Sequence, residues 1–155
     1  MRGLLLKLTF LGLLLLPAAF AVAAELSVQL RPASATFKQG HVPRFIVTIQ
    51  NAANSTIKVV DVVKRSDLKD AYARFSVTES GKPVKVPIAI SDPGPISEGD
   101  LVTLLPMQAL TFEHSGFPLG LDRLRPGSYE AKLVFYPNVG SSAVTSNTVS
   151  FRVIQ

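Results

Sequence analysis

The chain has 155 residues, a length that suits one domain of ordinary size. Apolar residues make up 47% of it and charged residues 17%, a balance that excludes a disordered chain. Because the sequence contains no cysteine, it excludes disulfide bonds, thiol catalysis and thiolate zinc sites, and a packed core has to stabilise the fold.

Residues 1–24 have the pattern of a secretory signal peptide. Arg2 and Lys7 give a basic start, a leucine-rich stretch follows, and small residues come after Pro17. The competing interpretation is an uncleaved membrane anchor, but the uncharged stretch is barely long enough to span a bilayer and a proline interrupts it. We therefore predict that the protein is exported, secreted or periplasmic, and without a membrane association after cleavage.

Cleavage is expected after Ala24, with cleavage after Ala23 as the alternative. It removes two of the 16 basic residues and none of the 11 acidic ones, so residues 25–155 keep a net charge of only +3. The remaining basic residues are scattered along the chain, whereas a nucleic-acid interface needs a concentrated basic face. We expect one mature domain and no nucleic-acid partner.

The mature chain alternates apolar and polar residues with a period of two, which is typical of half-buried strands. A single helical turn is expected at 66–73, and the prolines of loop 87–98 exclude a central strand there. The strands predicted in chain order are 26–30, 45–49, 57–63, 72–78, 84–86, 100–105, 110–113, 128–136 and 148–154.

So many short strands at even spacing predict an all-β fold, an immunoglobulin-like antiparallel Greek-key β-sandwich of seven to nine strands. One local pattern supports it. Pro126 and Gly127 form a turn just before a long strand, and Tyr129 follows at the start of that strand. In Greek-key sandwiches a tyrosine at this position packs its ring inward and bonds the backbone of the corner through its hydroxyl. We predict such a tyrosine corner at Tyr129.

The succession of segments resembles a known family. The segments are Leu26–Val28, Val47–Asn51, Phe75–Val84, Asp100–Leu104 and Pro126–Tyr129. They resemble, in their order, the non-catalytic N-terminal β-sandwich of deuterolysin-type (peptidyl-lysine) metalloendopeptidases. A similar layout also occurs in small bacterial proteinase-inhibitor domains.

The sequence departs from that family in two places. The turn after the middle strand reads Leu105-Pro106-Met107-Gln108 instead of a Leu-Pro-Gly-Glu-like turn. The protease domain is missing, and no His-Glu-x-x-His, which would place two imidazoles on one helical face, occurs in the chain. The resemblance therefore implies an accessory or binding module and not a peptidase.

Candidates for catalysis or metal binding are few. The two histidines, His41 and His114, are interpreted as surface residues, because neither has a second ligand near it in sequence. Ser55–Lys58 and Ser66–Lys69 match the Ser-x-x-Lys motif of penicillin-recognising enzymes, but its partner motifs Ser-Asp-Asn and Lys-Thr-Gly do not occur. We predict no catalytic residue, no cofactor and no metal site.

Two polar loops are the candidate binding surface, because binding residues concentrate on loops held by a rigid scaffold. The first contains Asp92, Gly94, Glu98 and Asp100. Calcium ligation by its carboxylates is the alternative to a solvated acidic loop, but their spacing matches no calcium loop. The second loop, 137–146, contains Asn138 and Gly140.

Together these observations predict a monomeric, non-enzymatic module that binds another exported protein, in a protease-associated or inhibitory role. The alternative is a structural surface component of the adhesin or pilus type, which assembles by pairing strands between chains. Carbohydrate binding is disfavoured, because the chain has no tryptophan on which a sugar could stack.

Overall fold

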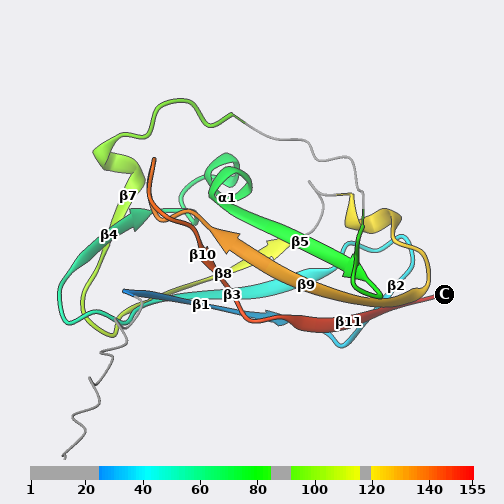
Figure 1. Cartoon of the computed structure of the whole chain (residues 1–155). Coiled ribbons are helices and arrows are strands. Elements are labelled where there is room, and N and C mark those ends of the chain that lie inside the picture. Colours follow the sequence, from blue (N-terminus) through cyan, green and yellow to red (C-terminus); the bar gives the residue numbers. More distant parts are fainter. Residues whose placement is uncertain (1–24, 85–91, 116–119) are drawn as a thin grey trace, which may run out of the picture.

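The computed structural model describes residues 25–84, 92–115 and 120–155 (Figure 1). Two β-sheets face each other, and a short helix lies beside them. In chain order the elements are β1 (Leu26–Pro32), β2 (Thr36–Lys38), β3 (Arg44–Asn51), β4 (Ile57–Val60), α1 (Ser66–Tyr72), β5 (Ala73–Glu79), β6 (Lys82–Pro83), the 3-10 helix η1 (Glu98–Asp100), β7 (Leu101–Leu104), β8 (Ala109–Ser115), the 3-10 helix η3 (Leu121–Arg123), β9 (Gly127–Phe135), β10 (Val144–Thr145) and β11 (Val149–Ile154).

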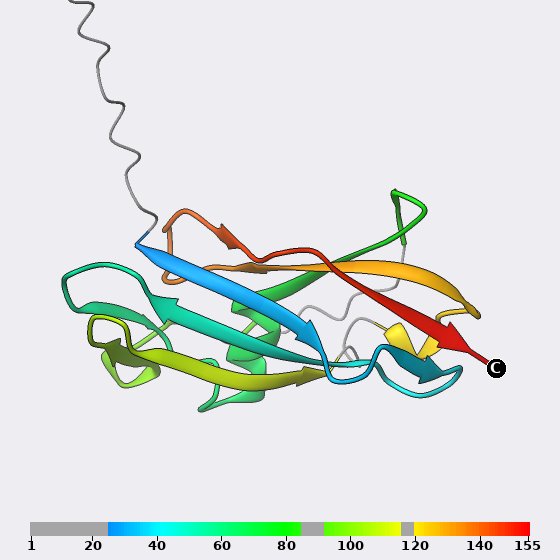
Figure 2. The same ribbon diagram turned by 90° about the horizontal axis from the view of Figure 1, so that it is seen from below.

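The strand order confirms the predicted fold class. In the described residues a three-stranded sheet has the order β1-β3-β8, and a six-stranded sheet has the order β2-β11-β9-β5-β6, with β10 pairing with β9 beyond the start of β11. β4 and β7 form a separate two-stranded ladder. The chain crosses repeatedly between the two larger sheets, because β1, β3 and β8 belong to one and β2, β5 and β9 belong to the other (Figure 2). Among the residues that the structure describes, all strand pairs are antiparallel except β2 with β11, which is parallel. This is the Greek-key layout of immunoglobulin-like sandwiches.

Alternate side chains of each long strand enter the space between the sheets, as the period of two predicts. In β3 the buried positions are Phe45, Val47 and Ile49, and in β9 they include Tyr129 and Leu133. The register of the strand pairs keeps these residues in line, because a slip by one residue would turn them toward solvent.

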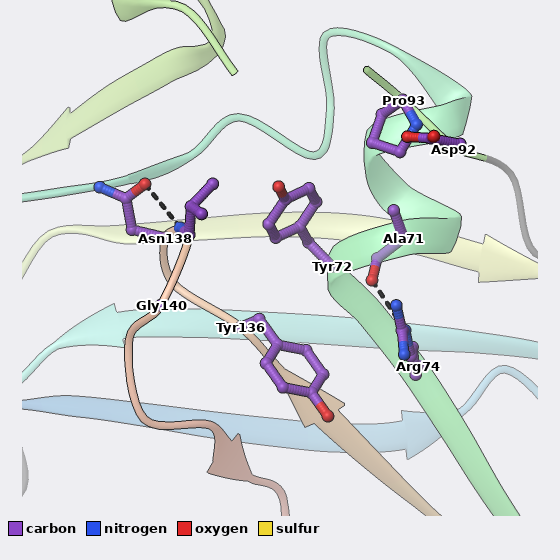
Figure 3. Close-up of a pocket in the computed structure, with 9 residues that line it drawn as sticks. Ala71, Tyr72, Arg74, Asp92, Pro93, Tyr136, Asn138 and Gly140 are labelled. Carbon is purple, nitrogen blue, oxygen red and sulfur yellow. Dashed lines mark hydrogen bonds between the residues drawn. The ribbon is translucent and has the colours of Figure 1, made fainter. Parts of the chain in front are cut away.

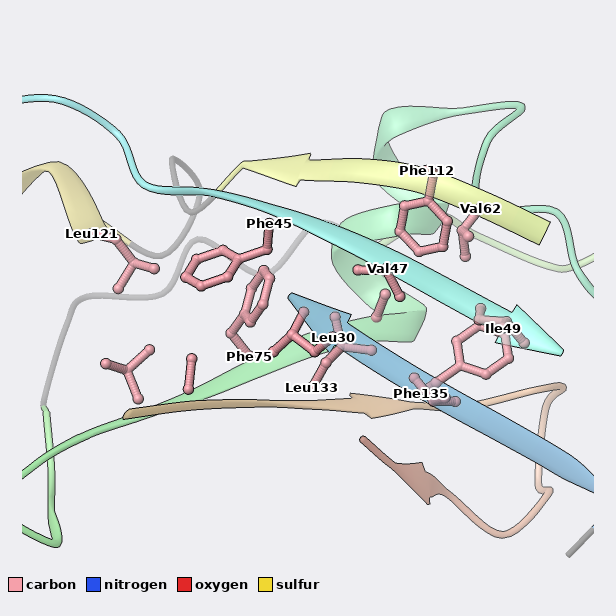
Figure 4. Close-up of a cluster of buried hydrophobic side chains, with 14 of the residues drawn as sticks. Leu30, Phe45, Val47, Ile49, Val62, Phe75, Phe112, Leu121, Leu133 and Phe135 are labelled. Atoms are coloured by element: carbon pink, nitrogen blue, oxygen red, sulfur yellow. The ribbon is translucent and has the colours of Figure 1, made fainter. Parts of the chain in front are cut away.

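Aromatic rings fill the centre of the core. The ring of Phe45 lies 4.8 Å from that of Phe75 and 5.4 Å from that of Phe151, so residues of both sheets meet there. Figure 4 shows Phe45 and Phe75 together, with Ile49 and Phe135 farther along the core. Burial of each such side chain contributes about 1.5–3 kcal/mol to the free energy of unfolding.

A buried asparagine joins the β3–β8 ladder to the smaller β4–β7 ladder. Asn51 ends β3, and its Nδ2 donates to the carbonyl oxygens of Ser55 (2.8 Å) and Leu104 (2.9 Å). Its Oδ1 accepts the amide of Ala53 at 2.9 Å. The side chain thus satisfies the backbone of the turn that leads from β3 into β4.

Several boundaries differ from the prediction. The described residues contain eleven strands instead of seven to nine; eight of these have four residues or more, while β2, β6 and β10 have only two or three, too few to show an alternation. The strand predicted to reach Val63 ends at Val60, because the Asp61 carboxylate accepts the amides of Val63 and Lys64 and closes a turn. Residues 85 and 86 of the predicted strand 84–86 lie outside the described residues.

The prediction of a surface position for His114 is wrong. His114 is only 3% exposed, and its ring lies 4.8 Å from that of Phe75 in the facing sheet. Its Nε2 is 2.8 Å from the carbonyl oxygen of Ala73, and its Nδ1 is 3.0 Å from that of Ser115. The alternation of β8 puts His114 on the inward face with Phe112. Desolvation by burial lowers the pKa of His114 to about 4, so the imidazole is neutral at pH 7.

Candidate functional site

The predicted corner residue Tyr129 lies at the end of the sandwich where β9 begins. Its ring is buried and stacks on that of Phe151 at 5.6 Å, and its Oη donates to the carbonyl oxygen of Arg125 at 2.8 Å. Pro126 is exposed, while Gly127 lies close to this hydrogen bond. A Cβ there would lie 2.9 Å from the Glu79 Oε1 and 3.3 Å from the Tyr129 Oη, so both side chains would have to shift. These three residues form a structural corner.

The acidic loop divides into two parts with different surroundings. Glu98 and Asp100 belong to η1, where Glu98 forms an exposed ion pair with Lys58 at 2.9 Å. The Asp100 carboxylate accepts the hydroxyl (2.7 Å) and the amide (3.0 Å) of Ser97, and these hydrogen bonds hold the pKa of Asp100 below its ordinary value. Asp100 therefore bonds within its own loop, and Glu98 pairs with β4.

Arg65, which the sequence analysis did not single out, fastens this loop to the start of α1. Its guanidinium pairs with Asp67 and, at 3.4 Å, with Asp100. One of its Nη groups also donates to the carbonyl oxygen of Pro93 at 3.0 Å. The two parts of the loop are thus held to the same side chain.

The other part of the loop, at Asp92 and Gly94, lies against a groove of about 560 Å³. Figure 3 shows the arrangement: Tyr72, Arg74 and Tyr136 line the groove between the end of α1 and the end of β9. Asp92 and Pro93 form one rim, and residues 138–140 form the opposite rim. We call this depression the tyrosine groove.

The tyrosine groove brings together three of the six predicted loop residues, Asp92, Asn138 and Gly140. Gly94 is held next to it, because its amide donates to the Asp92 Oδ1 at 2.9 Å and its φ of +70° permits the turn. Glu98 and Asp100 do not line it. The two loops therefore meet, but only in part.

The sequence did not predict that Tyr72 and Tyr136 line a common groove. Tyr72 precedes β5 and Tyr136 follows β9, and the pairing of Ala73 with Phe135 places the two tyrosines side by side. The backbone amide of Tyr136 also donates to the carbonyl oxygen of Tyr72 at 2.8 Å. Both rings are half-buried. The available signal was that two of the three tyrosines are end residues of predicted strands, 72–78 and 128–136, but only the pairing of those strands brings the two tyrosines together.

In the Ser-x-x-Lys segment of α1, the lysine, Lys69, makes structural contacts. Lys69 Nζ donates to the carbonyl oxygen of Glu113 at 3.1 Å and lies over the ring of Phe112, so it does not turn toward Ser66. In the ranges that the structure describes, no three histidine, aspartate or glutamate side chains gather to hold a metal ion. No helix within these ranges is long and apolar enough to cross a membrane.

Comparisons with known proteins find distant structural likenesses only. No protein-family model and no curated protein matches the sequence. The CARDB domain of a Pyrococcus furiosus protein, crystallised with di-metal ions, is 11% identical, with a TM-score of 0.43 over 83% of this chain and 87% of that one. Spo0M, a sporulation control protein of Bacillus subtilis, is 10% identical, with a TM-score of 0.46 over 84% of this chain and 49% of that one.

The third likeness is to a β-glucosidase of Listeria innocua in complex with glucose, which is 15% identical, with a TM-score of 0.41. The alignment covers 83% of this chain but only 16% of the glucosidase. Likenesses of this degree are too loose to transfer a function to this chain.

Proposed function

We propose that this chain is an exported, non-enzymatic binding module that holds another exported protein in the tyrosine groove. The observation that carries the proposal is the convergence of two separate loops and two tyrosines, Tyr72 and Tyr136, on one depression of about 560 Å³. Loops on a rigid scaffold are the usual place of binding residues, and a groove of this size is within the range of ligand sites.

The chemistry of the groove suits a protein surface. Tyrosine and arginine are the residue types that contribute most to protein–protein binding, and Tyr72, Arg74 and Tyr136 supply both. Val139 at the tip of the opposite rim is 68% exposed, although it is apolar. A partner that covers Val139 would remove this apolar surface from water.

The same residues give little support to an enzyme. Among the described residues that line the groove, the ionisable ones are Asp92, Arg74 and the two tyrosines. No histidine and no serine or threonine belongs to this lining, so it offers no nucleophile with an adjacent base. Association with a protease stays a prediction of the sequence resemblance alone.

Capture of partners from the exported proteins of the host tests the proposal. The baits are tagged residues 25–155, a groove variant with Tyr136→Leu and Val139→Asn, and a control variant with Leu105→Asn and Met107→Asn. The control residues are also apolar, 57% and 70% exposed, and lie in the β7–β8 turn outside the groove. None of these substitutions changes the net charge.

We expect one exported protein to be retained by the unchanged domain and by the control variant, and to be lost from the groove variant. Equal retention by all three baits would place the binding surface elsewhere and contradict the proposal. Recovery of only further copies of the bait would favour the alternative, a component that assembles with itself by strand pairing.

A further inference from the structure

Arg74 is held in a fixed orientation at the wall of the tyrosine groove. Its Nε donates to the carbonyl oxygen of Ala71 at 2.9 Å, and its guanidinium carbon lies 5.4 Å from the centre of the Tyr136 ring (Figure 3). A cation above an aromatic face is attracted by the ring. The hydrogen bond uses Nε, and in the described ranges neither Nη group has a hydrogen-bond partner.

The chain supplies no carboxylate to Arg74. All 11 acidic residues lie within the described ranges, because residues 1–24, 85–91 and 116–119 contain no aspartate and no glutamate. The ion pairs of the described residues join Arg44 to Glu113, Lys58 to Glu98, and Arg65 to Asp67 and Asp100, and none involves Arg74. This arginine is therefore oriented without an acidic partner of its own.

Asp92 is the acidic residue that shares the groove with Arg74. Its Oδ1 accepts the amide of Gly94 at 2.9 Å, so it shapes its own loop. Its charge at the rim also repels a second anion, which makes the groove unfavourable for a run of acidic residues. One carboxylate, placed at Arg74, is the arrangement that these charges favour.

We infer that the groove recognises a short extended segment of the partner protein in which one acidic side chain pairs with Arg74 and an apolar neighbour covers Val139. This inference rests on the proposed function and specifies its ligand. The planar guanidinium matches a carboxylate through two parallel hydrogen bonds, and its contacts with the Ala71 carbonyl oxygen and the Tyr136 ring limit the directions from which a carboxylate can approach. Val139 and the two tyrosine rings provide the apolar contact beside it.

Two tripeptides test the inference on the ¹⁵N-labelled domain, residues 25–155, by NMR titration. Both are acetylated and amidated; one is Leu-Glu-Leu and the other Leu-Gln-Leu, so they differ only in the carboxylate. The reporters are the amides of Val139 and Gly140 and the Nε–H of Arg74. The variants are Arg74→Gln, Arg74→Lys and, as a control outside the groove, Arg152→Gln on the exposed side of β11.

We expect the Glu peptide to shift the three reporters and to bind about fivefold or more tightly than the Gln peptide, as a charge-assisted pair requires. Arg74→Gln should remove this preference, Arg74→Lys should weaken it, and Arg152→Gln should keep it. Equal binding of the two peptides, shifts confined to other surfaces, or no shifts at the solubility limit would each overturn the inference.

The outcome can be separated from that of the proposed function. If the groove variant loses its captured partner but the two peptides bind equally, only the acidic specificity fails. If capture does not depend on the groove, the proposed function fails whatever the peptides do.

Discussion

The side chain of Asn147 pairs with both backbone polar groups of Leu30. Its Oδ1 accepts the Leu30 amide at 2.8 Å, and its Nδ2 donates to the Leu30 carbonyl oxygen at 3.0 Å. Asn147 lies between β10 and β11 in one sheet, whereas Leu30 lies in β1, the edge strand of the other. The Asn147 side chain therefore makes the two hydrogen bonds that a neighbouring strand would make at this edge. These backbone groups of Leu30 are then not available to pair with a second chain.

Asn147→Ala should lower the free energy of unfolding by about 1–3 kcal/mol, because it leaves two partly buried backbone groups without partners. The freed edge should also cause self-association that rises with protein concentration. Urea unfolding measures the first effect and sedimentation measures the second. A variant as stable and as monomeric as the unchanged domain would show that the Asn147 contacts do not protect this edge.

The burial of His114 makes stability depend on pH. Its pKa is about 4 in the folded protein and about 6.5 in an unfolded chain, because burial disfavours the imidazolium and Lys69 adds repulsion. Between about pH 4 and pH 6.5 the unfolded state therefore binds more protons than the folded state. The contribution of the neutral ring to the free energy of unfolding is fully present above about pH 6.5. It falls by about 3 kcal/mol as the pH falls toward 4.

Urea unfolding at a series of pH values from 8 to 4 checks this dependence. His114→Gln, which cannot titrate, should give a flatter curve over the same window, whatever its absolute stability. Parallel curves for the two proteins would mean that the imidazole does not become charged on unfolding.

The tyrosine corner can be tested by removing one oxygen atom. Tyr129→Phe should lower the free energy of unfolding by about 0.5–1.5 kcal/mol, because the Arg125 carbonyl loses its hydrogen bond. Tyr136→Phe is the matched control, since no hydrogen bond is found for its hydroxyl among the described residues, and it should leave stability unchanged. Equal effects of the two substitutions would contradict a specific role for the corner.

Arg65 should determine how firmly the rim of the tyrosine groove is held. Arg65→Gln removes the ion pairs with Asp67 and Asp100 and the hydrogen bond to the Pro93 carbonyl. We expect faster amide hydrogen exchange in residues 94–100, with little change in the strands of the core. Lys58→Gln, which breaks only an exposed ion pair, should change this exchange much less.

The long strands were predictable because their alternation reflects burial on one face. β1, β3, β9 and β11 each lie where the sequence indicated a strand. β2, β6 and β10 were not predictable, because pairing with a neighbour, and not their own composition, defines strands of two or three residues. The burial of His114 was missed for a related reason: alternation separates Glu113 from His114 but does not say which of them faces inward.

The candidate site was predictable only in part. Loop composition pointed to Asp92 and Asn138, which the groove does bring together. Tyr72, Arg74 and Tyr136 were missed, because they belong to the ends of a helix and of two strands and became neighbours only through the β5–β9 register. A single sequence carries no local signal for such a juxtaposition.

The parallel pairing of β2 with β11 determines when this sheet can be completed during synthesis. It joins Thr36 to Arg152, residues that are far apart in sequence, so β2 cannot pair in this sheet until β11 has been synthesised. Sandwiches dominated by such distant pairings fold in about milliseconds to seconds. A domain that cannot complete this sheet before β11 has been synthesised stays open until then, and an open chain is the form that a membrane pore admits if the predicted signal peptide at residues 1–24 directs export.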